Sequence, residues 1–425
     1  MRKVAFMAFA LLAVMACGAK EEQKVVLGDE QFDKYIPLLE GQRVAVFSNQ
    51  TGIVGDKVLS GGIDERYAEA LARGENPDRS LIPFGQPVTG QHVLDALIEK
   101  GVNVTAIFSP EHGFRGNADA GEHVSSSVDE VTGVPIVSLY DVGKHTAGED
   151  NMSMFDVLVV DIQDVGLRFY TYYVTMKNLM DVCAQNGKKV IILDRPNPNG
   201  FYVDGPILDM RFKSGVGALP IPVVHGLTLG EMALMINGEG WLTDGIKADL
   251  TVIPCLNYSH QTKYSLILAP SPNIKDMKAV YFYPSTCYFE GTVISLGRGT
   301  DFPFEAYGHP DMKDCTFTFT PRSIPGAKNP PLLDQECQGV DLRQVPDEEI
   351  WAGGVDLKYL VDAYDKLGAG EDFFIRNNFF NRLVGTDYVY DMILEGASAD
   401  EIKARWQDDV AAFKEQRKPY LLYAE

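Results

Sequence analysis

Four runs of apolar, mostly β-branched residues constrain the fold more than any other feature of this chain, because each stops at a cluster of polar, Gly or Pro residues. The runs cover residues 44–47, 102–108, 157–160 and 190–193. Short apolar runs bounded by turn-forming residues are typical of buried parallel β-strands. In an open parallel sheet, the segments that follow the carboxyl ends of the strands lie along one edge, where ligands bind. The sequence therefore predicts that side chains from four distant segments form one site.

Helix signals alternate with these strands. One helix is predicted over residues 90–100 with Thr89 as its N-cap, and another over residues 171–186. Thr228 and Glu231 have the spacing of a capping box, which predicts a third helix and a structural role for Glu231. The alternation predicts an α/β fold with a Rossmann-like, doubly wound and mostly parallel sheet.

The rest of the chain has a different pattern. Residues 269–308 are rich in Pro, Gly, Ser and aromatic residues, which predicts functional loops or a domain junction. We predict an N-terminal catalytic domain at residues 31–250 and a smaller C-terminal auxiliary domain of α/β (α+β) type at residues 251–425. The predicted elements of the auxiliary domain are a strand over 316–320 and helices over 356–367, after Thr386 and over 399–417.

The N-terminus has the pattern of an export signal. Its start is basic, and the apolar run over residues 4–16 is too short to span a bilayer as a stable helix. The string Val-Met-Ala-Cys fits a bacterial lipobox, so residues 1–17 are predicted to be a lipoprotein signal peptide with Cys17 as the lipidated residue. Ordinary cleavage near the same point is the alternative. With residues 18–30 as a polar tether, we expect an exported protein that is lipid-anchored to a bacterial membrane, in the periplasm or at the cell surface.

Charge and missing motifs exclude several function classes. The net charge of −21 disfavours nucleic acid as a partner, and it means that an anionic substrate needs a locally positive pocket. The sequence contains no nucleotide-binding glycine motif, no zincin motif and no nucleophile elbow. A metal site from His112, Asp161 and Asp164 lacks a characteristic ligand spacing. We therefore predict no cofactor and no metal ion.

The string Ser-Pro-Glu-His-Gly-Phe-Arg-Gly after the second run carries the sharpest chemical signal. A carboxyl group beside a proline and an aromatic residue at a strand end is expected to be partly desolvated, which raises its pKa and suits a general acid. Glu111 is the carboxyl group in question and His112 is its neighbour. The alternative is that Glu111 caps the following turn and His112 bonds to a buried carbonyl.

The clusters after the third and fourth runs add acids, guanidiniums and phenols. Asp164, Arg168, Tyr170 and Tyr172 lie in one strand-to-helix turn, and phenol rings suit sugar or aromatic ligands. An Asp164–Arg168 ion pair and core-facing tyrosines are the structural alternatives. In the fourth cluster, two prolines hold Asp, Arg and Asn rigidly, which favours binding. These residues are Asp194, Arg195 and Asn197.

Six strings in this chain resemble those of one family, the NamZ family (formerly DUF1343), and they occur in the right order from about Gln42 to Tyr423. The family contains exo-acting β-N-acetylmuramidases, which release N-acetylmuramic acid from the non-reducing ends of peptidoglycan-derived chains. The resemblance implies a Rossmann-like domain, a smaller C-terminal domain and a cleft between them. The strings are Phe-Ser-Pro-Glu-His-Gly-Phe-Arg-Gly, Asp-Ile-Gln-Asp-Val-Gly-x-Arg-Phe-Tyr-Thr-Tyr, Leu-Asp-Arg-Pro-Asn-Pro, Pro-Ile-Pro-Val-x-His-Gly-Leu-Thr-x-Gly-Glu, Pro-Ser-Pro-Asn and Glu-Gly-Thr-x-x-Ser-x-Gly-Arg-Gly-Thr.

Residues and resemblance together suggest a glycoside hydrolase acting on muropeptides and on the MurNAc-GlcNAc disaccharide. Glu111 is assigned as the general acid and His112 as its partner, with Asp164, Asp194 or the substrate's acetamido group as the second group. Arg168, Arg195 or Arg298 is expected to pair with the lactyl carboxylate of muramic acid. A non-catalytic muropeptide-binding lipoprotein and a different, metal-dependent hydrolase are the alternatives. The predicted substrate-binding residues are Asn49, Arg168, Tyr170, Tyr172, Arg195, Asn197, His225, Glu290, Arg298 and Glu305.

Overall fold

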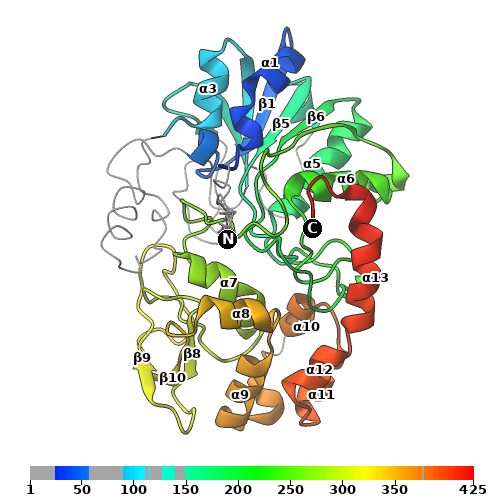
Figure 1. Cartoon of the computed structure of the whole chain (residues 1–425). Coiled ribbons are helices and arrows are strands. Elements are labelled where there is room, and N and C mark those ends of the chain that lie inside the picture. Colours follow the sequence, from blue (N-terminus) through cyan, green and yellow to red (C-terminus); the bar gives the residue numbers. More distant parts are fainter. Residues whose placement is uncertain (1–23, 57–89, 111–113, 115–126, 139–148, 376–377) are drawn as a thin grey trace, which may run out of the picture.

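A computed structural model describes residues 24–56, 90–110, 114, 127–138, 149–375 and 378–425. Two units lie one above the other in Figure 1, with a large sheet in the upper unit and a small sheet in the lower one. The predicted signal peptide, with Cys17, lies outside the described residues, and so do Glu111 and His112.

The large sheet has the topology that the sequence predicted. Its seven strands are ordered β3-β4-β2-β1-β5-β6-β7, and every neighbouring pair is parallel except β3 with β4. The four apolar runs are β1, β2, β5 and β6, and they form the middle of this sheet. The strands are β1 (Arg43–Ser48), β2 (Asn103–Ser109), β3 (Ser127–Val128), β4 (Pro135–Ser138), β5 (Val157–Asp161), β6 (Lys189–Leu193) and β7 (Asp249–Ile253).

Both faces of the sheet are covered, which is why its strands are apolar throughout rather than alternating. Successive residues of a strand point to opposite faces. Val44 and Val46 of β1 therefore pack in the cluster that holds Tyr35 of α1 (Phe32–Leu39) and Leu97 of α3 (Val93–Glu99). Ala45 and Phe47 belong to the larger cluster on the other face, which includes residues of α5 (Tyr172–Gln185) and α6 (Leu229–Gly238). Figure 1 shows these two helix pairs on either side of the sheet.

Three helix predictions can be compared with the structure. α5 and α6 lie where they were expected, and the Thr228–Glu231 capping box is present at the start of α6. The predicted N-cap of α3 was wrong: the cap residue is His92, whose Nδ1 accepts a hydrogen bond from the backbone N–H of Leu94. A histidine nitrogen satisfies the same orphan donor as the usual hydroxyl cap, and the residue-type rule did not anticipate it.

The lower unit is a small α+β layer. Its antiparallel sheet has the order β8-β10-β9. The predicted single helix over 399–417 is two helices separated at Trp406, which is buried and donates a 2.7 Å hydrogen bond from Nε1 to Asp204 Oδ1. The elements are α7 (Met277–Thr286), β8 (Ala306–His309), β9 (Phe317–Phe319), β10 (Cys337–Asp341), α8 (Asp347–Gly353), α9 (Lys358–Leu367), α10 (Phe379–Val384), α11 (Tyr388–Leu394), α12 (Ala399–Ala404) and α13 (Gln407–Arg417).

The two units share one hydrophobic core, and the C-terminal segment of the chain runs from the lower unit back to the upper one. The larger core cluster runs from Phe47 of the sheet to Trp406 of the lower unit. Figure 1 shows α13 returning along the side of the molecule toward α6. After it, Tyr423 packs beside Tyr258 and donates a 2.6 Å hydrogen bond to Asp194 Oδ2. β7 extends past residue 250, and the domain boundary at that residue stays a prediction.

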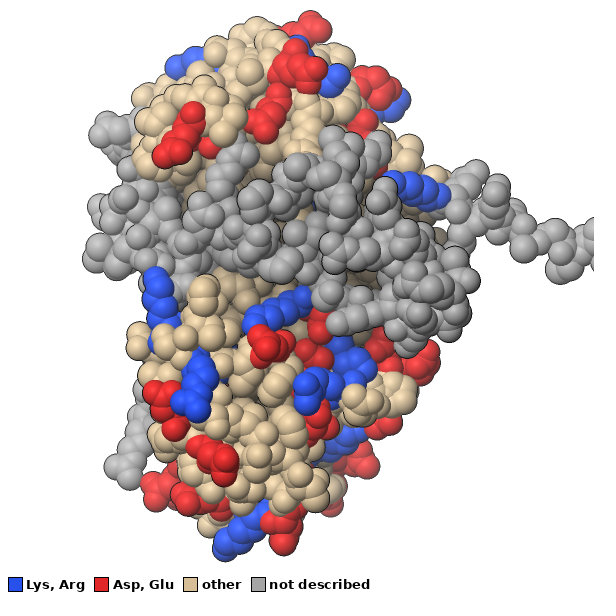
Figure 2. Space-filling view, turned by 90° about the vertical axis from the view of Figure 1, so that its left-hand side faces the viewer, with Lys and Arg blue, Asp and Glu red and all other residues tan. Residues whose placement is uncertain are grey.

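The charge of the surface and the hydrophobicity of the helices are relevant to two possible partners, nucleic acid and a membrane. On the face shown in Figure 2, Lys and Arg side chains of the lower unit lie among Asp and Glu side chains. The described part of this face therefore presents no broad basic surface of the kind that binds nucleic acid. Among the ranges that the structure describes, no helix combines the length and the hydrophobicity needed to cross a bilayer.

Candidate active site

The candidate site lies at the carboxyl edge of the sheet, between β1 and β5. The strand order β4-β2-β1-β5-β6-β7 is that of a dinucleotide-binding sheet. Strands that precede β5 in the chain lie on one side of β1 and later strands lie on the other, so the order of strand addition reverses between β1 and β5. Ligands of open α/β sheets bind in the crevice at this reversal. The segments leaving the two strands contain Asn49 and Gln50 after β1, and Gln163 and Asp164 after β5.

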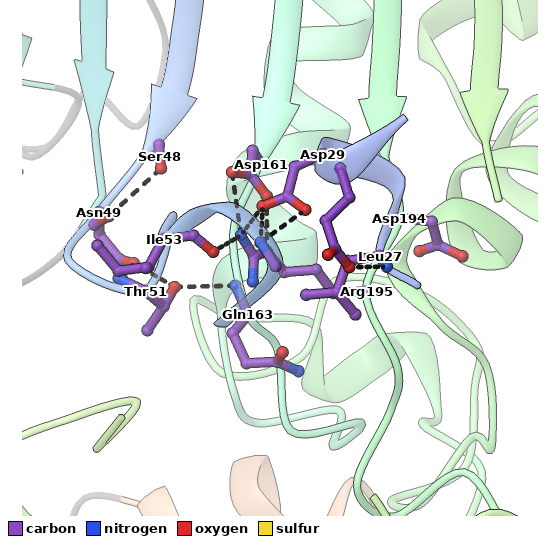
Figure 3. Close-up of polar contacts among 12 residues, drawn as sticks. Leu27, Asp29, Ser48, Asn49, Thr51, Ile53, Asp161, Gln163, Asp194 and Arg195 are labelled. Carbon is purple, nitrogen blue, oxygen red and sulfur yellow. Dashed lines mark hydrogen bonds and ion pairs between the residues drawn. The ribbon is translucent and has the colours of Figure 1, made fainter. Parts of the chain in front are cut away.

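Three charged side chains, Arg195, Asp161 and Asp29, form a buried group next to this edge of the sheet. Arg195 donates from Nε to Asp161 Oδ1 at 2.6 Å and from Nη2 to Asp29 Oδ2 at 2.8 Å (Figure 3). All three side chains are buried. Arg195 also donates to the carbonyl of Ile53. That Arg195 binds the substrate stays a prediction, and in the structure its guanidinium holds two carboxylates inside the fold.

Asp29 shows where the folded part of the chain begins. The predicted tether ran to residue 30, but Leu27, Gly28 and Asp29 are buried. The backbone N–H of Gly28 donates to Asp194 O, and a Cβ at Gly28 would lie 2.5 Å from the backbone N of Asp194. Residues 27–30 thus belong to the sheet unit. No periodic pattern in the sequence marks these residues, because their burial depends on contacts with β6 and β7.

Asn49, Tyr170 and Tyr172 form one hydrogen-bond network that closes the edge. Asn49 Nδ2 donates to the Tyr172 hydroxyl at 2.9 Å, while Asn49 Oδ1 accepts from the backbone N–H and the hydroxyl of Thr51. The hydroxyls of Tyr170 and Tyr172 both donate to the carbonyl of Pro270, at 2.8 and 3.2 Å. The polar atoms of these residues thus tie the loop at Pro270 to the sheet, and both tyrosine side chains are buried.

Asp164 is the candidate catalytic carboxyl group that the structure describes at this edge. Oδ1 accepts a 2.7 Å hydrogen bond from the backbone N–H of Gly166, while Oδ2 is buried and has no partner among the described residues. Burial raises the pKa of the Asp164 carboxyl to about 7, against backbone hydrogen bonds from Gly166 and Val165 that lower it. A carboxyl group that titrates near neutral pH suits acid–base catalysis.

Two glutamines, which the sequence analysis missed, add to the unpaired acceptors. Gln163 donates from Nε2 to the carbonyls of Asp164 and Pro196, and Gln50 donates to the carbonyl of Ala269. In both amides the Oε1 atom is buried and has no partner in the described part of the chain. In Figure 3 the Gln163 side chain points away from the Arg195 group. Buried acceptors without donors indicate a water or a ligand that carries donors.

Asp194 was one of the options for the second catalytic group, which stays a prediction, and its carboxylate is engaged within the fold. Its two oxygens accept from the Thr228 hydroxyl at 2.7 Å, the backbone N–H of Gly230 at 2.8 Å and the Tyr423 hydroxyl. The side chain is wholly buried, and burial raises its pKa to about 6. In Figure 3 it lies apart from the Asp161 and Arg195 side chains. Asp194 therefore anchors the start of α6 and the C-terminal tail to the sheet.

Arg168 is also part of the fold rather than of a substrate pocket. Its guanidinium is fully buried and donates to the carbonyls of Pro206, Ile221, Leu383 and Val384 at 2.6 to 3.2 Å. Both Nη groups are thus engaged, while the buried Nε has no partner among the described residues. A substrate-binding role for Arg168 stays a prediction, and the four carbonyls come from segments that are distant from it in the sequence.

Asn197 and His225 are likewise buried. The Asn197 amide donates to Leu227 O and accepts from Asn199 N–H, and it packs against Gly166, where a Cβ would lie 2.2 Å from it. Asn197 thus fixes the turn that carries Asp164. Burial lowers the pKa of His225 to about 3, so its ring is neutral, and Nδ1 accepts a hydrogen bond from the backbone N–H of Leu227.

The three remaining predicted residues lie in the lower unit. Glu305 is buried, and burial together with the neighbouring Asp276 raises its pKa to about 8. Glu290 and Arg298 form an ion pair with a 2.6 Å distance between Oε1 and Nη2, and each side chain is 23% exposed. They are the predicted substrate-binding residues that the structure leaves partly open to solvent. No cluster of three or more possible metal ligands is found within the described ranges.

Comparison with known proteins shows which family this chain belongs to. Models for the N-terminal and C-terminal parts of the exo-β-N-acetylmuramidase NamZ match residues 84–278 and 281–423. The peptidoglycan β-N-acetylmuramidase NamZ of Bacillus subtilis is 34% identical over 422 residues, covering 95% of this chain and 92% of the relative. This chain belongs to the NamZ family.

Solved structures of the NamZ (DUF1343) family confirm the fold. A crystal structure of a DUF1343 family protein from Bacteroides fragilis is 55% identical, with a TM-score of 0.81 over 95% of this chain and 100% of that one. A second one from the same organism is 25% identical, with a TM-score of 0.74 over 94% and 99% of the two chains. The mostly parallel sheet and the smaller second unit are thus features of the NamZ family.

The pKa of Asp164 gives a stability prediction. A carboxyl group whose pKa is raised by folding stabilises the fold fully below the pKa of the unfolded state, and this contribution is lost as pH rises through the folded pKa. Asp164→Asn removes the titration and keeps the shape. We expect the free energy of unfolding of the variant, relative to wild type, to rise between pH 4 and pH 7 by at most about 4 kcal/mol. Urea unfolding of both proteins across this range measures it, and a pH-independent difference would contradict the burial of this group.

Proposed function

We propose that this protein hydrolyses peptidoglycan fragments as an exo-acting glycoside hydrolase that releases N-acetylmuramic acid from their non-reducing ends. The observation that carries the proposal is the match to a peptidoglycan β-N-acetylmuramidase over nearly the whole chain. Its substrates on this proposal are muropeptides and saccharides such as MurNAc-GlcNAc.

The unpaired acceptors at the sheet edge support a saccharide ligand. Gln50 Oε1, Gln163 Oε1 and Asp164 Oδ2 offer buried acceptors without donors in the described part of the molecule. Sugar hydroxyls and the N–H of an acetamido group are donors that match such atoms. The rings of Tyr170 and Tyr172, at a centroid distance of 4.7 Å, lie at the same edge and provide apolar faces for a sugar ring.

Cleavage of a glycosidic bond needs a proton for the leaving oxygen and stabilisation of an oxocarbenium-like centre. In this proposal Glu111 donates the proton, assisted by His112, and Asp164 is the second group. Below pH 7 the Asp164 carboxyl is largely protonated, so it acts as a base or nucleophile only above that pH. The substrate's acetamido group is the alternative nucleophile. We leave Asp194 out of this role because its oxygens already accept hydrogen bonds from Thr228, Gly230 and Tyr423.

A chromogenic β-N-acetylmuramide tests the proposal directly. We expect the purified wild-type protein to release the chromophore and Glu111→Gln to lose about 10²- to 10⁴-fold in rate, as loss of a general acid requires. Glu415→Gln, a change of the same type at an exposed residue of α13, is the matched control and should keep full activity. Absence of release by wild type, or full activity of Glu111→Gln, refutes the proposal. Saccharide binding without turnover would indicate a non-catalytic glycan-binding protein instead.

The proposal places the enzyme at a bacterial membrane through a lipid on Cys17. The lipobox-like string before residue 18 motivates this part of it. In cells that express Cys17→Ser we expect the protein to leave the membrane fraction, because two acyl chains at this residue supply the anchor. Fractionation followed by immunoblotting measures it, and unchanged membrane association of the variant would argue against lipidation there.

A further inference from the structure

We infer that Arg298, held by Glu290, selects muramic acid over glucosamine by binding the lactyl carboxylate of the sugar. This inference rests on the proposed function and adds to it the residue that sets substrate specificity. N-acetylmuramic acid differs from N-acetylglucosamine by the lactyl group on O3, so a single charged group distinguishes the two sugars.

The structure separates Arg298 from the two other arginines predicted for this role. Arg168 is fully buried and both of its Nη groups bond to backbone carbonyls, while Arg195 bonds to two carboxylates and a carbonyl. Among the described residues the Arg298 side chain makes one hydrogen bond, from Nη2 to Glu290, and it is 23% exposed. A guanidinium has five N–H donors, so Arg298 retains donors in a geometry that suits a second carboxylate.

The backbone presents Arg298 rigidly. Gly297 and Gly299 on either side have φ values of 84° and 82°, which other residues rarely adopt. A Cβ at Gly297 would lie 2.8 Å from Phe302 O, and one at Gly299 would lie 2.6 Å from Arg322 O. The turn therefore requires both glycines, and a ligand meets a guanidinium that is already ordered, which reduces the entropy lost on binding.

Two further bonds close this turn. The Thr300 hydroxyl donates to Gly297 O at 2.6 Å, and Lys275 Nζ donates to Thr300 O at 2.8 Å. The Arg298 guanidinium lies 5.3 Å from the centre of the Phe304 ring, which supports its flat face. Glu290 comes from the short 3₁₀ turn Cys287–Gly291 after α7, so the ion pair joins two loops of the lower unit.

A chain of aromatic rings connects Arg298 to the sheet edge. The ring of Phe304 lies 4.6 Å from that of Tyr283, and Tyr283 lies 6.3 Å from Tyr170. Tyr170 in turn follows the Asp164 turn and bonds to the loop at Pro270. A series of three ring contacts thus links Arg298 in the lower unit to the acceptor-rich edge of the sheet. A sugar whose hydroxyls meet the acceptors of the sheet edge would direct an acidic substituent toward the lower unit.

Binding measurements test the inference without relying on turnover. Isothermal titration with N-acetylmuramic acid, its lactyl carboxamide and N-acetylglucosamine is compared for wild type, Arg298→Gln and Arg322→Gln. Arg322 is the matched control, since it removes the same charge from an exposed side chain of the same unit. We expect Arg298→Gln to raise the Kd for N-acetylmuramic acid by about 10- to 100-fold, the scale of a charge-assisted contact. The Kd values for the two uncharged sugars should change less than about threefold.

Several results would overturn the inference. One is an equal loss of affinity for all three sugars in Arg298→Gln, which would indicate a structural role. Another is a wild-type protein that binds N-acetylmuramic acid no more tightly than its carboxamide. Glu290→Gln provides a second variant, because loss of the orienting partner should weaken acid binding less than loss of Arg298. Failure of the chromogenic assay with selective binding intact would refute only the hydrolytic proposal.

Discussion

Arg195→Met is expected to destabilise the protein by about 3 to 5 kcal/mol or to prevent its folding, the cost of removing one member of a buried ion group. The guanidinium bonds to Asp161 and Asp29, which are both fully buried. Without it, two carboxylates remain in a region where water cannot solvate them. Chemical unfolding, monitored by circular dichroism, measures the free energy of unfolding.

A charge-neutral combination separates charge from packing. Asp29→Asn and Asp161→Asn in the Arg195→Met background remove the buried charges, and we expect this triple variant to recover part of the lost stability. Arg211→Met is the control at an exposed ion pair, whose loss should cost no more than about 1 kcal/mol. If Arg195→Met is as stable as wild type, Arg195 does not balance these carboxylates.

Arg168→Met is expected to have an effect of similar size, at least about 3 kcal/mol, for a different reason. The substitution deprives four buried carbonyls of their donor, and each unsatisfied polar group costs about 1 to 3 kcal/mol before relaxation. Two of these carbonyls, at Leu383 and Val384, belong to the end of α10, and the other two belong to loops of the upper unit. The loss should therefore loosen the contact between the units.

Hydrogen exchange localises this effect. In Arg168→Met we expect faster amide exchange in residues 379–385 than in wild type, in addition to the lower free energy of unfolding. Arg168→Lys should be intermediate, because an ammonium cannot reach four carbonyls at once. Arg382→Met changes an exposed arginine of the same helix and serves as the control. Unchanged protection of residues 379–385 in Arg168→Met would contradict the role of Arg168 as a link between the units.

Local sequence patterns were sufficient for the secondary structure. The four central strands, α5, α6 and the Thr228–Glu231 capping box follow from apolar runs and cap residues that lie within a few positions of one another. The positions of the strands also predicted that the candidate site lies at the carboxyl edge of the sheet.

The roles of individual side chains were less predictable. Asp194, Arg195 and Arg168 all follow apolar runs, as ligand-binding residues do, yet the structure engages each with a partner distant in sequence. Asp29 and Gln163 carried no recognisable pattern, although one completes the charge group and the other supplies an unpaired acceptor. A motif identifies the residue type at a position, but not which neighbours have already used its donors and acceptors.

By itself, the sequence determined the family, the fold class and the strand ends at which chemistry is expected, because these depend on local periodicity and on strings of adjacent residues. Only the tertiary structure decided which polar groups remain available to a ligand. Hydrogen-bonding capacity is limited, and contacts between residues far apart in the chain consume most of it. Asp164, Gln163 and Arg298 retain capacity, whereas the oxygens of Asp194, the guanidinium of Arg195 and both Nη groups of Arg168 are engaged within the fold.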